Sequence, residues 1–142
     1  MHSPKFQTYS VKHQSTGFEF YILSKGLNSG KPLVTPCPNS FVCICKSQEQ
    51  KDFYFWLLFG LWKAKHFHQF LTGSVMPFIR LSDLKDEVFN QAEKVSKQEK
   101  EYKSTVDKIK QLEEKEKAIR QNLALINDLK RAMIYRHLKS KW

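Results

Sequence analysis

Three short segments in the first third of the chain have the apolar and polar patterns that are typical of strands. Residues 5–12 alternate between apolar and polar side chains. Residues 17–23 are rich in aromatic and β-branched side chains, and the apolar run at residues 40–45 indicates a buried strand. Glycine, proline, asparagine and serine are frequent between residues 24 and 38, which predicts turns between the second and third segments. We therefore expect three strands, which together form a small sheet.

An apolar helix is predicted after the third strand. Ser47 is a suitable N-cap residue for a helix that begins at the next position. Apolar residues then recur almost all round the predicted helix over residues 53–70, which indicates burial on several sides. We expect Thr72 and Gly73 to end this helix. The segment 75–81 contains a proline and is expected to be extended.

The chain contains no glycine and no proline over residues 83–142, and most of that stretch has a helical pattern that begins near Ser82. Up to Ile109, apolar residues recur in steps of three, four and seven, as in a coiled coil. At Leu112 the apolar pattern shifts to a new frame. We expect one mostly continuous helix. A helical hairpin is the alternative, because residues 104–107 form a Ser-x-x-Asp capping box.

A long polar helix with a narrow apolar stripe is not stable alone in water, so it pairs with a copy, folds back or lies on a partner. We therefore predict an α+β protein. Residues 1–82 form a small sheet with one aromatic core helix, and residues 83–142 form a coiled-coil-like helix. The residues that we expect to contact a second copy or a helical protein partner are Val95, Tyr102, Val106, Ile109, Leu123 and Ile126.

The net charge of +10 is concentrated near the end of the chain. Residues 91–142 carry fourteen Lys or Arg against eight acidic residues, and residues 1–50 carry five against two. A basic balance favours a polyanion such as duplex DNA, although lysine-rich helices are also simply well solvated. The residues predicted to contact phosphates are Lys25, Lys31, Lys63, Lys65, Arg80, Lys130, Arg131 and Arg136, and the C-terminal basic cluster continues with Lys139 and Lys141.

The loop at residues 26–32 differs from a nucleotide-binding P-loop in two ways. Three residues separate its glycines where the P-loop has four, and Pro32 follows Lys31 where a hydroxyl residue is required. A surface turn between strands is therefore expected. The alternative is a loop that contacts a phosphate backbone through Lys25, Lys31 and its main-chain N–H groups.

No set of residues predicts catalysis or metal binding. His66 and His68 are separated by about 200° on a helix, which prevents joint coordination of one metal. Cys37, Cys43 and Cys45 are one ligand short of a structural zinc site, and we expect buried, reduced thiols. Motifs of serine hydrolases and zinc proteases are also missing from the sequence. We therefore expect no cofactor, no metal and no enzymatic activity.

The longest apolar run, residues 53–62, has ten residues and is too short to span a bilayer. The first residues lack the apolar core of a secretory signal. We therefore expect a cytoplasmic protein with no membrane partner.

The sequence resembles two known families in parts of the chain. The blocks at residues 20–33 and 54–63 resemble an uncharacterised family of small proteins from Bacteroidota. The predicted strand at 41–45, the aromatic helix at 52–71 and a T-G-x-x-x-x-x-I-x-x-x-x-L segment are similar to the closing half of a target-recognition domain in specificity subunits of type I restriction–modification enzymes. The residues that match this segment are Thr72, Gly73, Ile79 and Leu84. This resemblance implies DNA recognition and a coiled coil formed by the long helix.

Two functional hypotheses follow. The first is a non-enzymatic module that binds nucleic acid and is related to type I specificity subunits. The alternative is a structural or interaction protein that forms a homodimer, or docks a partner, through its C-terminal coiled coil.

Overall fold

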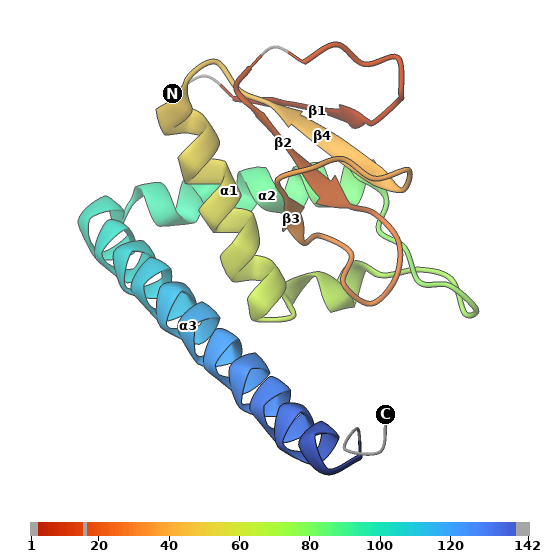
Figure 1. Cartoon of the computed structure of the whole chain (residues 1–142). Coiled ribbons are helices and arrows are strands. Elements are labelled where there is room, and N and C mark those ends of the chain that lie inside the picture. The colour runs from red at the N-terminus through yellow and green to blue at the C-terminus, as the bar shows by residue number, and fades with distance from the viewer. Residues whose placement is uncertain (1–2, 16, 139–142) are drawn as a thin grey trace. The chain divides into compact units, whose positions relative to one another are not determined.

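The computed structural model describes residues 3–15 and 17–138, so Lys139 and Lys141 of the predicted basic cluster lie outside the described residues. The chain divides into two compact units, residues 1–98 and 99–142. In the first unit the elements are β1 (Lys5–Thr8), β2 (Glu19–Leu23), β3 (Pro32–Leu33), β4 (Ser40–Ile44), α1 (Gln48–Lys63), the 3-10 helix η1 (His66–Phe70) and α2 (Leu81–Ser96). The second unit consists of α3 (Glu99–Leu138). The predicted α+β class, with a small N-terminal sheet and a long C-terminal helix, is confirmed (Figure 1).

The four strands form one antiparallel sheet in the order β1-β4-β2-β3 (Figure 1). In its centre, Phe6 of β1 and Phe20 of β2 both lie opposite Cys43 of β4. Side chains alternate between the two faces of a strand, so these three residues share one face. Phe20 and Cys43 are almost completely buried. The predicted three strands are present, and β3 is an additional strand that the sequence pattern did not predict.

Helices α1 and α2 cover the face of the sheet that carries Phe6 and Phe20. The Phe6 ring meets Tyr54 of α1 and Phe89 of α2 edge-on, with centroid distances of 6.5 and 5.5 Å. Phe20 meets Phe55 of α1 in the same way at 5.4 Å. Burial of each such side chain stabilises the fold by about 1.5–3 kcal/mol. The aromatic core predicted for α1 is therefore shared between both helices and the sheet.

The opposite face of the sheet is covered by the segment between β1 and β2. His13 of this segment lies 2.7 Å from Glu19 Oε2 through its Nε2 atom and 3.4 Å from Gln7 Nε2 through its Nδ1 atom. The Tyr9 ring meets Tyr21 of β2 edge-on at 5.6 Å. These contacts hold the segment against β1 and β2, so that both faces of the sheet are covered.

The predicted start of α1 is confirmed, and its predicted end is wrong. Ser47 accepts a hydrogen bond from the Gln50 backbone N–H at 3.1 Å, and Gln50 Oε1 accepts one from Lys46 N at 2.8 Å, which makes a reciprocal cap. The helix ends at Lys63, well before Thr72 and Gly73. The chain turns at Lys65, which has a φ of 59° in the left-handed region, and continues as η1.

The helical pattern after residue 83 forms two helices, whereas we expected one mostly continuous helix. A turn at Lys97 and Gln98 separates α2 from α3, and it lies upstream of the capping box at residues 104–107. Helix α2 buries Leu84 and Val88 within the first unit. In α3, by contrast, none of the described residues is buried. The 40 residues of α3 therefore have no core of their own.

Within the described residues, no helix is long and apolar enough to cross a membrane.

Candidate functional site

A basic and aromatic cluster lies at the C-terminal end of α1. The Trp62 indole ring has two ammonium groups close to its centroid, Lys31 Nζ at 5.0 Å and Lys63 Nζ at 5.3 Å. Trp62 Nε1 donates a hydrogen bond to Asn28 Oδ1 at 3.3 Å. We call these residues, Asn28, Lys31, Trp62 and Lys63, the Trp62 cluster. The negative face of the indole attracts cations, which holds two positive charges together at the surface.

Gly30 explains why the loop before β3 reaches this position. Its φ of +97° is disfavoured for any residue with a side chain, and its N–H donates to Leu23 O at 2.7 Å. A Cβ atom at Gly30 would lie 2.2 Å from Cδ2 of Phe67, which is itself buried in η1. The loop therefore packs directly on η1, and His68 of η1 donates to Leu27 O at 3.1 Å. This close approach brings Lys31 to Trp62.

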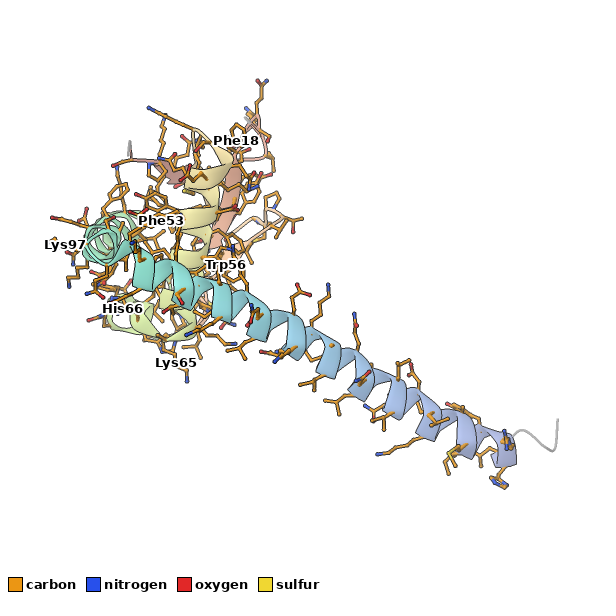
Figure 2. All side chains as sticks on the ribbon, turned by 90° about the vertical axis from the view of Figure 1, so that its left-hand side faces the viewer. Phe18, Phe53, Trp56, Lys65, His66 and Lys97 are labelled. Atoms are coloured by element: carbon orange, nitrogen blue, oxygen red, sulfur yellow. The ribbon has the colours of Figure 1, made fainter. Side chains whose placement is uncertain are left out.

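The structure brings together only part of the predicted phosphate-binding set. Lys31 and Lys63 meet at Trp62. The exposed side chain of Lys65 follows α1, where Figure 2 shows it beside His66, and Arg80 is the exposed residue that precedes α2. Lys25 is exposed, and its backbone forms a bridge with Phe78. The remaining members, Lys130, Arg131 and Arg136, belong to α3 in the second unit.

The second candidate site is the surface of α3. Every residue from 117 to 138 is exposed, although many of them are large and apolar (Figure 2). The exposed large apolar residues of α3 are Leu112, Ile119, Leu123, Leu125, Ile126, Leu129, Met133, Ile134, Tyr135 and Leu138, with exposed fractions between 49% and 65%. An exposed apolar surface of this kind is a candidate interaction site.

The predicted partner-contact residues divide between two helices. Val95 lies on α2, just before the turn that separates α2 from α3. The other members lie on α3: Tyr102, Val106 and Ile109 are half-buried, and Leu123 and Ile126 are exposed.

One His–Glu pair connects elements that are distant in the sequence. His66 Nε2 lies 2.7 Å from Glu87 Oε1, which also accepts a hydrogen bond from Gln91 Nε2 at 2.7 Å. Burial opposes the ionisation of Glu87, but these hydrogen bonds and the nearby positive charge hold the pKa of Glu87 below its usual value. The pair joins η1 to α2. The sequence offered no signal for it, because 21 positions separate the two residues.

A second pair, His13 and Glu19, lies under the segment that covers the sheet. The side chain of Glu19 is only 3% exposed. Burial, followed by the negative charge of Glu19, raises the pKa of Tyr21, which lies two residues further along β2. Both His–Glu pairs fasten segments of the first unit to each other, and we assign them a structural role.

The cysteines behave as small apolar residues. Cys43 and Cys45 are buried with their sulfur atoms 3.8 Å apart, and burial raises the pKa of the Cys43 thiol. Cys37 is partly exposed, and all three cysteines are free. Among the described residues, no group of three or more His, Cys, Asp or Glu side chains is arranged to hold a metal ion.

Comparison with known proteins identifies one relationship. The model of a family of unknown function (DUF6943) matches residues 6–136. The comparisons with the curated proteins and with the solved structures gave no match.

Proposed function

The chain belongs to the DUF6943 family, whose function is unknown, and we propose that it is a non-enzymatic interaction protein whose helix α3 pairs with α3 of a second copy. The observation that supports this proposal is the exposed apolar surface of α3. The helix has 40 residues and is therefore about 60 Å long. A helix of this length that buries none of its described residues needs a partner for its apolar side chains.

The energy available from pairing is considerable. Full burial of one Leu or Ile side chain contributes roughly 1.5–3 kcal/mol, and Leu123 and Ile126 are still 57% and 49% exposed. Pairing of two copies would bury these side chains on both copies. Knobs-into-holes packing along a shared apolar seam is the usual way in which long helices achieve this.

Light scattering on the purified protein tests the proposal. We expect the mass of a dimer for the wild type and the mass of a monomer for Leu123→Asp. Leu125→Asp is the matched control, since Leu125 is as exposed as Leu123 but lies about 200° further round the helix. We expect this control to remain dimeric. A wild type that stays monomeric at the highest attainable concentration would refute the proposal.

A second function is favoured by the Trp62 cluster. Two lysines held beside an indole are suited to phosphates and nucleic-acid bases, so we propose that this surface binds nucleic acid, with duplex DNA as the probe. Fluorescence anisotropy at about 50 mM salt, where phosphate contacts are strong, measures this binding. Lys31→Ala with Lys63→Ala should weaken binding severalfold more than Lys85→Ala with Lys94→Ala, an equal loss of charge on α2. Equal effects of the two pairs of substitutions, or no binding by the wild type, would refute nucleic-acid binding by the Trp62 cluster.

A further inference from the structure

Between residues 112 and 133, two neighbouring rows of side chains run along α3 at a spacing of seven residues. The first row is entirely apolar and consists of Leu112, Ile119, Ile126 and Met133, each about half exposed or more. Within this span the second row has a leucine at its centre and opposite charges on either side, and consists of Glu116, Leu123 and Lys130. Glu116 also forms an ion pair with Arg120, one turn further along the same helix. Residues three and four apart are neighbours on a helix, so the two rows together form one continuous face.

The direction of pairing decides what the charged residues meet. If two copies paired in parallel and in register, Glu116 would face Glu116 of the other copy, and Lys130 would face Lys130. Like charges within a seam are repulsive. Parallel pairing would therefore place two repulsive contacts beside the apolar row.

Antiparallel pairing removes both repulsive contacts. Glu116 and Lys130 each lie seven residues, about 10 Å along the helix, from Leu123. Reversal of the second helix about Leu123 therefore exchanges their positions and places each carboxylate beside an ammonium group of the other copy. The apolar row is also almost symmetric about this point, because the reversal exchanges Leu112 with Met133 and Ile119 with Ile126.

From this charge complementarity we infer that α3 pairs with α3 of a second copy in an antiparallel orientation centred near Leu123. This inference rests on the proposed function, because it specifies the geometry of that dimer. In each half of the seam, Glu116 of one copy lies beside Lys130 of the other copy. The charged residues therefore select the orientation, and the apolar row supplies most of the binding energy.

Charge reversal provides the first test, with the dimer dissociation constant measured by sedimentation equilibrium. Glu116→Lys and Lys130→Glu should each weaken the dimer about tenfold, because each change turns two attractive contacts into two repulsive ones. The double variant Glu116→Lys with Lys130→Glu should recover affinity, since its charges are again complementary. Glu114→Lys and Lys117→Glu are the controls: they change the net charge equally, outside both rows, and should have little effect.

Cross-linking gives an independent test of orientation in a Cys37→Ser background. In the antiparallel dimer the two copies of Leu112 are about 33 Å apart, far beyond the roughly 7 Å that a disulfide allows between Cα atoms. Leu112→Cys alone should therefore form no covalent dimer, and Met133→Cys alone should form none. A mixture of the two variants should form a disulfide between different chains.

The outcomes separate the inference from the function on which it rests. A wild type that dimerises, with single charge reversals no weaker than their controls and with Leu112→Cys cross-linking to itself, would overturn the antiparallel orientation and leave the dimer in place. A monomeric wild type would overturn both. A recovered double variant together with cross-linking only in the mixture is the expected result.

Discussion

Gly30 fixes how closely the loop before β3 approaches η1, and its replacement by alanine tests this contact. The φ of +97° should cost an alanine about 1–2 kcal/mol. The reduced freedom of the unfolded chain offsets about 0.4–1 kcal/mol of this cost. The added Cβ atom would also lie 2.2 Å from the ring of buried Phe67, and overpacking of this kind costs about 1–3 kcal/mol. We expect Gly30→Ala to lower the free energy of unfolding by about 2–4 kcal/mol.

Gly26 supplies a matched control in the same loop. Its φ is +91°, yet a Cβ atom there would have no neighbour within 4 Å. Gly26→Ala should therefore show the backbone strain alone, about 1 kcal/mol. Urea unfolding followed by the fluorescence of Trp56 and Trp62 in α1 measures both variants.

Comparison of the two alanine variants isolates the contact with Phe67. Equal destabilisation by Gly30→Ala and Gly26→Ala would refute the close packing of the loop on η1. A double-mutant cycle with Phe67→Leu adds a direct test, because the smaller side chain should relieve the overpacking. We expect a coupling energy of about 1 kcal/mol or more between positions 30 and 67.

Three further predictions concern the same unit. Glu87→Gln should be less stable than the wild type at neutral pH, as measured by urea unfolding. The pKa of Glu87 is lowered in the folded state, so its carboxylate stabilises the fold only above the pKa of the unfolded chain, and the difference between the two proteins should shrink as the pH falls below about 4.5. A difference in stability that does not change with pH would contradict this prediction. Lys65→Gly should raise the free energy of unfolding by about 0.5 kcal/mol, since glycine tolerates the φ of 59° without strain, and a loss of stability in thermal melts would count against it. A thiol reagent should modify Cys37 in the native protein and reach Cys43 only on unfolding; rapid modification of Cys43, seen by mass spectrometry of peptides, would show that the sheet opens.

The elements that depend on local signals were predictable from the sequence. Strands β1, β2 and β4 lie within segments of apolar and aromatic residues, and the N-cap at Ser47 has its partner three residues later at Gln50. Strand β3 has two residues, too few for a pattern, and exists because Leu33 lies opposite Tyr21. It depends on a long-range contact that the spacing of residues does not reveal.

The end of α1 was not predictable for a related reason. Phe67 and Phe70 continue the apolar pattern beyond Lys63, so the sequence favours a longer helix. The chain instead turns at Lys65, and Phe67 is buried against Gly30, far away in the sequence. Tertiary packing here overrides local propensity.

The candidate sites also combine features that the local sequence predicts with features that depend on long-range contacts. Lys31 and Lys63 could be named individually from the charge pattern, but their meeting at Trp62 depends on the loop that Gly30 allows. On α3, the spacing of the apolar residues alone changes frame at Leu112. When Glu116 and Lys130 are counted as members of a row, the seven-residue spacing runs through Leu123 without interruption.

The short strand β3 has a consequence for the behaviour of the protein at high concentration. It lies at one edge of the sheet, it is two residues long, and its first residue, Pro32, has no N–H to donate. An exposed edge strand is a template on which other chains aggregate, and short edges with proline suppress such growth. This edge of the sheet is therefore a poor starting point for fibrils, even at a high concentration of the protein.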